Sequence, residues 1–202
     1  MESNNSLAIF DFDNTITTKD TLKEFILYYF GKRNYYKGMF ICSRFILLYL
    51  FKIISNNLAK EKVLTYFFKD TKMEDIVNAG ISFSNNYLPL IIDANALLKI
   101  NSHKSNGDTL VIISASSRIW FYDWGIKNGF QIIISTELEI KNGKLTGKIK
   151  GNNCYGLEKV KRLIEIVDLN QFNYIYVYGD SKGDYDLLKI ADEGYLKFKR
   201  IK

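Results

Sequence analysis

The stretch LAIFDFDNTIT, residues 7–17, is the most informative part of the chain for its fold class. Four apolar residues, typical of a buried strand in a sheet that is covered on both faces, lead directly into Asp11 and Asp13. In open α/β sheets, ligands bind in a crevice outside the carboxyl ends of the strands. The two carboxylates are therefore predicted to lie in a ligand-binding crevice.

A second strand-like segment ends in the same way. The stretch YIYVYGDSKGDYDLL, residues 174–188, carries Asp180 and Asp184 after its apolar run. Clustered carboxylates repel one another unless a cation lies between them, and their hard oxygen atoms favour Mg²⁺. The sequence thus predicts a Mg²⁺ site that handles phosphate.

Four segments, in order along the chain, resemble the motifs of the haloacid dehalogenase (HAD) superfamily of phosphohydrolases. DFDNT resembles the nucleophile loop, and TLVIISAS (residues 109–116) resembles the second motif, an apolar strand that ends in Ser. GNNCYGLEK (151–159) resembles the third motif, which supplies a lysine, and GDSKGD (179–184) resembles the acidic fourth motif. The Ser-Ala-Ser form, the Asn-Cys-x-Gly-x-x-Lys loop and the long insertion after the first motif are most similar to the phosphoserine-phosphatase-like subgroup.

The order of elements predicts an α/β fold with a doubly wound, mostly parallel sheet, because strand-like runs alternate with helical patterns. In this superfamily such a sheet is the Rossmannoid core, and the resemblance implies the strand order 5-4-1-2-3. Apolar and polar residues alternate around Lys141-Asn142-Gly143, which predicts a small β-hairpin. The helical pattern of residues 17–101 corresponds to an inserted all-α cap, which leaves 1–16 and 102–202 as the core domain.

The resemblance also implies roles for individual residues. Asp11 would be the nucleophile that becomes an aspartyl-phosphate, and Asp13 the general acid and base. Lys159 would add a fixed positive charge facing Asp11. The predicted metal ligands are Asp11, the Asp13 main-chain carbonyl and Asp180, with Asp184 either a further ligand or a hydrogen-bond partner of the ligands. The predicted substrate-binding groups are Ser114, Ala115, Ser116 and Asp20, although Asp20 fits a plain helix cap equally well.

Composition narrows the classes of partner. The net charge is +6, but the Lys and Arg residues are scattered without a basic stripe, so we expect small anionic substrates and no nucleic acid. Two isolated cysteines, Cys42 and Cys154, cannot form a disulfide framework, and the start MESNNSLAIF does not read as a secretion signal. A cytoplasmic protein is the expectation, and nothing in the sequence indicates an oligomeric state.

Three further predictions concern residues in and next to the predicted cap. Arg33 and Arg44 are the candidates for holding a substrate carboxylate. MFICSRFILLYLFKII, residues 39–54, is too short for a membrane span, and we interpret it as a buried cap helix in preference to an interfacial helix that meets lipid. His103 lies in the polar segment NSHKSNG and is expected to be solvated.

The sequence therefore predicts a Mg²⁺-dependent phosphatase acting on a small phosphorylated metabolite. A variant has the same chemistry on a lipid phosphate, or passes the phosphoryl group to another alcohol. From a different class, the chain could be a non-catalytic protein that binds a phosphorylated ligand.

Overall fold

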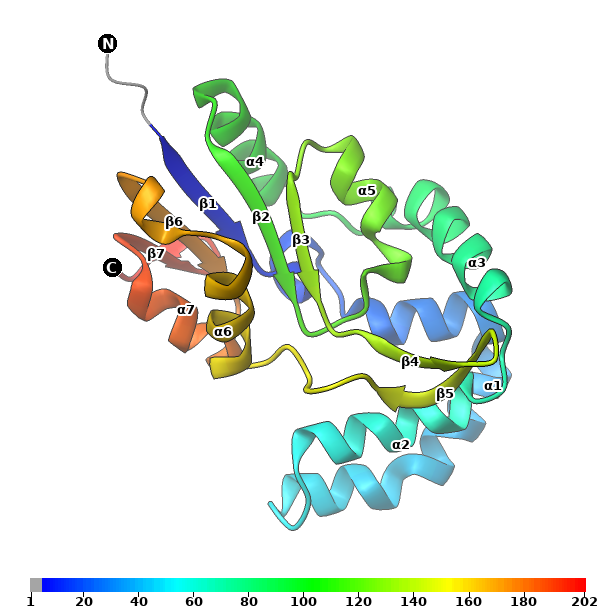
Figure 1. Ribbon diagram of the computed structural model, residues 1–202. Coiled ribbons are helices and arrows are strands. Elements are labelled where there is room, and N and C mark those ends of the chain that lie inside the picture. Colours follow the sequence, from blue (N-terminus) through cyan, green and yellow to red (C-terminus); the bar gives the residue numbers. More distant parts are fainter. Residues whose placement is uncertain (1–4) are drawn as a thin grey trace.

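A six-stranded sheet forms the centre of the computed structural model, which describes residues 5–202 (Figure 1). Residues 1–4 of the predicted core domain lie outside the described residues. The strand order is β3-β2-β1-β6-β7-β8. The strands are β1 (Ser6–Phe10), β2 (Thr109–Ser114), β3 (Ile132–Ser135), β6 (Tyr174–Gly179), β7 (Glu193–Leu196) and β8 (Lys199–Arg200). All neighbours pair in parallel except β7 and β8. The predicted α/β fold and strand order are confirmed, with β8 added at one edge.

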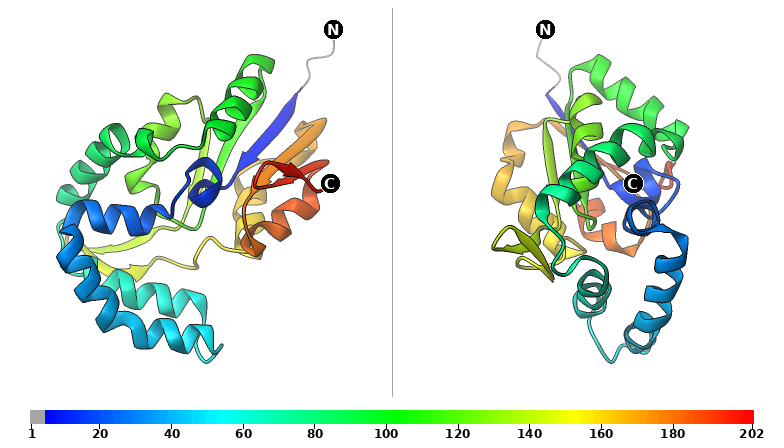
Figure 2. Two further views of the ribbon diagram at one scale, coloured as in Figure 1. Left: turned by 180° about the vertical axis from the view of Figure 1, so that it is seen from behind. Right: turned by 90° about the vertical axis from the view of Figure 1, so that its right-hand side faces the viewer.

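The two faces of the sheet are both buried, as the apolar strands predicted. Side chains alternate across a strand, so Leu7 and Ile9 of β1 face one core while Ala8 and Phe10 face the other. The first core is completed by α6 (Leu157–Ile166) and α7 (Tyr185–Ile190). The second core is completed by α4 (Ala94–Asn106) and α5 (Tyr122–Lys127), on the opposite side of the sheet (Figure 2). The carboxyl ends of β1, β2 and β6 are thereby held rigidly side by side.

The helical segment between β1 and β2 consists of α1 (Thr21–Leu50), α2 (Asn56–Phe68), α3 (Met73–Asn86) and α4. Gly31, with φ of +79°, interrupts the helical geometry of α1. Beyond it, α1 packs closely on α2. The two helices approach so closely that a Cβ at Gly38 would lie 2.3 Å from the Phe67 ring, and only glycine fits there. The division into domains at 16/17 and 101/102 stays a prediction, and α4 runs across the second of these boundaries.

The predicted hairpin is present as β4 (Leu138–Lys141) and β5 (Lys144–Ile149). Asn142 and Gly143 both have positive φ, which is the backbone conformation that makes Asn-Gly a favoured two-residue hairpin turn. The hairpin reaches the helical insertion: Thr65 of α2 donates a hydrogen bond to the Gly147 carbonyl at 3.1 Å. This contact fastens the outer helices to the core.

The prediction that residues 39–54 form a buried helix is wrong. Phe40 and Phe51 are 82% and 74% exposed, and Leu47, Leu50 and Ile53 are also exposed. The second half of α1 and α2 form a helix pair at one end of the molecule, so that α1 has a packing partner on one side only (Figure 2). Among residues 5–202, no helix is both long enough and apolar enough to cross a membrane.

The prediction for His103 is also wrong. Its side chain is buried, with Nδ1 lying 2.6 Å from Asp108 Oδ2 and Nε2 lying 2.9 Å from the Tyr178 hydroxyl. The physical reason is that α4 continues through the polar segment to Asn106. His103 therefore shares the helix face of Ala96 and Ile100, which packs against the sheet.

Candidate active site

Asp11 lies at the carboxyl end of β1 and is almost completely buried. Its main-chain N–H donates to the Tyr178 carbonyl of the neighbouring β6 at 2.9 Å. A tight helical turn over Phe12–Ile16 follows, in which Asn14 takes positive φ (+57°). This reversal lets the chain leave the sheet at once, so the Asp11 carboxylate faces the crevice.

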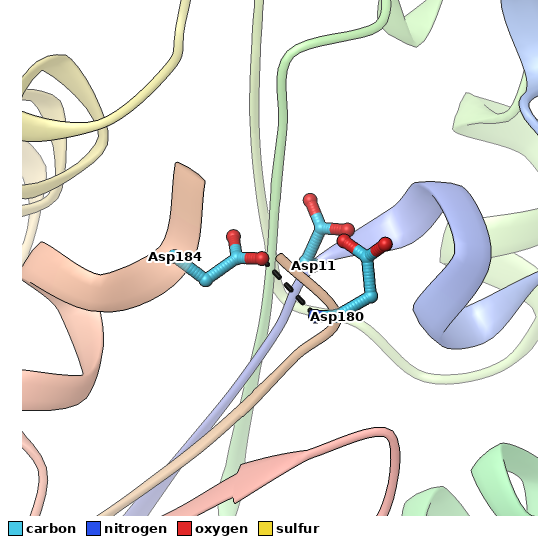
Figure 3. A group of neighbouring side chains, drawn as sticks. All are labelled: Asp11, Asp180 and Asp184. Atoms are coloured by element: carbon cyan, nitrogen blue, oxygen red, sulfur yellow. Dashed lines mark hydrogen bonds between the residues drawn. The ribbon is translucent and has the colours of Figure 1, made fainter. Parts of the chain in front are cut away.

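Asp180 and Asp184 come from the loop after β6 and reach the same place (Figure 3). The Asp184 carboxylate accepts hydrogen bonds from the main-chain N–H groups of Asp180 (3.1 Å) and Ser181 (3.2 Å), which close the loop. The closed loop requires glycine at position 179, because the Cβ of any other residue would lie 2.6 Å from the Asp184 Cβ. Carboxylate oxygen atoms of Asp11, Asp180 and Asp184 lie within 4.8 Å of one another.

Lys159 joins this cluster from the first turn of α6, and its side chain is buried. Its Nζ donates to Asp11 Oδ1 and to Asp184 Oδ1, each at 2.6 Å. Burial alone would lower the pKa of Lys159, but the two carboxylates outweigh it and raise the pKa above its usual value. Lys159 is therefore a permanent cation in the centre of the acidic cluster.

The pKa of Asp11 is set by burial and by the charges around it. Burial raises its pKa well above the usual value, and the charges of Asp184 and Asp13 add to this, while Lys159 lowers it. The Asp11 carboxyl group therefore depends on neighbouring positive charge to stay ionised.

The donor set fits a hard divalent cation. Three carboxylate groups that present oxygen atoms within 4.8 Å of one another are the ligands that Mg²⁺ prefers, and Mg²⁺ needs only a few protein ligands because it retains water. Asp13 is placed differently from the other three predicted ligands. Its carboxylate accepts hydrogen bonds from the Thr21 main-chain N–H (2.6 Å) and hydroxyl (2.5 Å). A metal contact through its main-chain carbonyl stays a prediction.

The segment after β2 completes the site. The Ser114 hydroxyl donates to Asp13 Oδ2 at 3.3 Å and accepts from the Ser116 main-chain N–H at 2.9 Å. Ala115 and Ser116 line the pocket above Asp11, so the structure brings these predicted substrate-binding residues to the acidic cluster.

The comparison with known proteins places this arrangement in a family. The model of the haloacid dehalogenase-like hydrolases matches residues 8–189. The chain belongs to this family. It is 30% identical to protein CicA of Caulobacter vibrioides over 195 residues, which cover 96% of the chain and 86% of CicA. It is also 26% identical to the histidinol-phosphatase of Neisseria meningitidis serogroup C, with 93% of the chain and 88% of that protein covered.

The fold is shared with phosphoserine phosphatase. A structure described as a phospho-aspartyl intermediate analogue of that enzyme superposes with a TM-score of 0.69 at 20% identity, covering 96% of the chain and 86% of the enzyme. The prediction of a HAD hydrolase with a phosphoserine-phosphatase-like fold is confirmed.

The active-site residues of this HAD hydrolase open into a pocket of about 630 Å³. Its floor carries the acidic cluster and Lys159, whereas its walls come from α1 and α2. The apolar wall residues include Leu22, Ile26, Tyr35, Met39, Ile46 and Val63. The pocket is thus charged where the reaction is predicted and apolar farther out.

Asp20 is confirmed as a helix cap, and its role in substrate binding stays a prediction. Its carboxylate caps α1 by accepting a hydrogen bond from the Lys23 main-chain N–H at 2.8 Å, and the residue also lines the pocket. Arg33 and Arg44, the candidates for binding a substrate carboxylate, are exposed, and neither is among the residues that line this pocket.

Lys60 is a pocket cation that was not predicted from the sequence. Its Nζ donates to the Ala115 carbonyl at 2.6 Å and to Asn153 Oδ1 at 3.1 Å, so it connects α2 to two of the motif loops. Burial lowers its pKa, against the raising effect of Asp13 and Asp20. No local pattern signals this lysine, because its partners are 55 and 93 residues away in the sequence.

Thr21 was not predicted as a site residue, and Trp120, which the sequence predicts to pack against the sheet or to border the pocket, has a role that was not predicted. The Trp120 indole N–H donates to the Thr21 hydroxyl at 3.1 Å, and that hydroxyl donates to the Asp13 carboxylate. The Trp120 ring stacks on Phe25 of α1, with ring centroids 4.9 Å apart. The helix N-terminus and a buried aromatic ring therefore fix the orientation of Asp13.

Replacing Asp20 with asparagine is expected to stabilise the metal-free protein at neutral pH. Burial and the neighbouring Asp13 charge raise the pKa of Asp20 to about 6. Because this folded-state value exceeds the usual 3.8, the free energy of unfolding falls as the pH rises through that interval. Asparagine retains the helix cap without the charge. Because Asp20 lies at the exposed rim of the site, solvent screens much of the charge effect, so we expect a gain of at most about 1 kcal/mol at pH 7.

The measurement is chemical denaturation of both proteins at pH 4 and pH 7. The two proteins should be equally stable at the lower pH, where Asp20 is protonated. A variant that is less stable than the natural protein at pH 7 would contradict the raised pKa of Asp20.

Proposed function

We propose that this HAD hydrolase is a Mg²⁺-dependent phosphatase that hydrolyses a small phosphate monoester through an aspartyl-phosphate on Asp11. The observation that carries the proposal is the position of Asp11. Its carboxylate lies on the floor of a pocket, 2.6 Å from the Lys159 ammonium group and beside two further carboxylates. A nucleophilic carboxylate that attacks a phosphate dianion needs this local positive charge.

The reaction has two displacements. In the first, an Asp11 oxygen forms a bond to phosphorus while the bond to the substrate alcohol oxygen breaks, and Asp13 donates a proton to that oxygen. In the second, Asp13 accepts a proton from a water molecule, whose oxygen displaces the Asp11 carboxylate and releases inorganic phosphate. Thr21 holds Asp13 by two hydrogen bonds, so the proton is delivered from a fixed position.

The phosphoryl oxygens require hydrogen-bond donors and positive charge near the nucleophile. The segment after β2 is the proposed source of the donors: Ala115 and Ser116 line the pocket, and Ser114 directly before them hydrogen-bonds to Asp13. Lys159 supplies the fixed charge. Asp11, Asp180 and Asp184, with the Asp13 carbonyl, would hold Mg²⁺. The ion supplies positive charge that reduces the repulsion between carboxylate and phosphate.

A small phosphorylated metabolite agrees with the two phosphatases named above, a histidinol-phosphatase and a phosphoserine phosphatase. The apolar wall of the pocket favours a second candidate class, phosphate monoesters that carry an apolar chain. Transfer of the phosphoryl group to another alcohol would use the same intermediate.

Turnover is expected to depend completely on the divalent ion. With p-nitrophenyl phosphate and Mg²⁺, inorganic phosphate should be released, EDTA should reduce the rate to background, and added Mg²⁺ should restore it. A panel of phosphoserine, histidinol phosphate and a lysophosphatidic acid then separates the two substrate classes. If no phosphate ester is hydrolysed while one of them still binds in calorimetry, the chain is a binding protein and the proposed reaction is wrong.

A further inference from the structure

The second half of α1 and the following loop expose a row of apolar side chains to solvent, interrupted at Ser43 and Arg44. Large apolar side chains recur at helical spacing along one face of the helix and continue into the loop. Each of them is between 53% and 82% exposed. We call this set the outer face; it consists of Tyr36, Phe40, Leu47, Leu50, Phe51 and Ile53. The opposite side of the same helix packs on α2 and lines the pocket, so the outer face has no partner among the described residues.

The charge of this region is one-sided. Residues 25–60 contain no Asp or Glu, although the whole chain has 22 of them. The same segment contains six Lys or Arg residues, and five of these are exposed; only Lys60 is turned toward the pocket. The five exposed cations are Lys32, Arg33, Lys37, Arg44 and Lys52. They lie along and beside the outer face, which is therefore both apolar and cationic.

We propose that the outer face binds the surface of an anionic lipid bilayer, with its apolar side chains among the acyl chains and its cations at the headgroups. A helix with exposed apolar side chains flanked by Lys and Arg binds such interfaces through buried apolar area and charge attraction together. A second copy of this chain is the less favourable occupant, because two outer faces would bring ten like charges together. The contact is peripheral, since no helix within residues 5–202 is suited to spanning a membrane.

The outer face lies next to the active-site pocket. Tyr49 and Asn56 flank the exposed loop, and both line the active-site pocket together with Tyr155 of the core. The loop and the helix pair form one end of the molecule in both views of Figure 2. Docking of the outer face would therefore hold the pocket close to the headgroup layer. The inference concerns binding and holds whether or not the reaction proposed above is correct.

The test is flotation of the full chain with lipid vesicles. Phosphatidylcholine vesicles are compared with vesicles that also contain phosphatidylglycerol. We expect binding to the anionic vesicles, weakening with added salt, and little binding to the neutral ones. Replacing Lys37 and Arg44 together with glutamine should weaken binding about 25-fold, because each cation near the surface contributes about a fivefold factor.

A matched pair of variants distinguishes the outer face from exposed apolar residues in general. Phe40→Ser, Leu47→Ser and Phe51→Ser combined should reduce binding at least about tenfold. The control combines Leu98→Ser, Ile164→Ser and Ile166→Ser, which change equally exposed residues of α4 and α6 and should leave binding unchanged. Circular dichroism and thermal unfolding verify that each variant is folded. None of the six residues lines the pocket.

Three results would overturn the proposal: no flotation of the natural chain, equal flotation with both kinds of vesicle, or no effect of the outer-face substitutions. A concentration-dependent dimer in analytical ultracentrifugation that the outer-face substitutions abolish would likewise reject it, and would assign this surface to a second copy.

Discussion

Replacing Asp11 with asparagine is expected to abolish turnover while leaving the fold intact. The asparagine amide cannot form the phosphoryl intermediate, so the rate with p-nitrophenyl phosphate should fall by at least about a thousandfold. Stability should change little, because the substitution preserves shape and removes a carboxylate whose pKa burial has raised. The measurements are steady-state phosphate release and the free energy of unfolding.

Asp186 provides the matched control for Asp11. It lies in α7, close to the site in sequence, but its carboxylate pairs with Lys189 at 2.7 Å on the surface. Asp186→Asn should therefore retain full turnover. If Asp11→Asn keeps more than a small fraction of the natural rate, or if Asp186→Asn loses it, the nucleophile is misassigned.

Replacing Lys159 with methionine is expected to damage both stability and activity. Methionine fills similar volume but leaves the buried Asp11 and Asp184 carboxylates without the cation that lies 2.6 Å from each. Removing one partner of a buried ion pair typically costs about 3–5 kcal/mol. We expect a loss of that size in the free energy of unfolding at pH 7, and turnover at background level.

Lys161 supplies the comparison, since it is exposed on the same helix two residues later. Lys161→Met should change the free energy of unfolding by less than about 0.5 kcal/mol. The deficit of Lys159→Met should also shrink at low pH, where the unpaired carboxylates take up protons and their burial becomes less costly. A deficit that is independent of pH would show that lost packing, and not the uncompensated charge, is responsible.

Much of the core could be predicted from local patterns. Leu7–Phe10 and Tyr174–Tyr178 were predictable as strands because apolar runs of that length fit a sheet covered on both faces. The Asn142-Gly143 turn was predictable because few residue pairs tolerate two positive φ angles. The acidic residues after the strands were expected to meet because parallel strands end at the same edge.

The missed residues depend on contacts between distant elements. Lys60 has no motif around it and is part of the site only because α2 packs over the loop after β2. Thr21 and Trp120 are 99 residues apart, and their hydrogen bond exists only in the folded chain. His103 was predicted to be solvated from its polar neighbours, but burial is decided by the helix face on which it lies and by Asp108 and Tyr178.

The exposure of the apolar segment 39–54 also could not be predicted from its own sequence. Its apolar composition favoured a buried helix over a helix at a lipid interface. Only the packing of α1 on α2 shows that one side is covered and the other exposed.

The sequence by itself determined the strands, the hairpin, the order of the motifs and the identity of the acidic residues, because these follow from periodicity and from chemistry within a few residues. The tertiary structure alone decided which lysines enter the pocket, what orients Asp13, and which face of α1 remains exposed. The reason is that a side chain's burial and charge environment are set by surfaces from distant parts of the chain, and their meeting is a property of the whole fold.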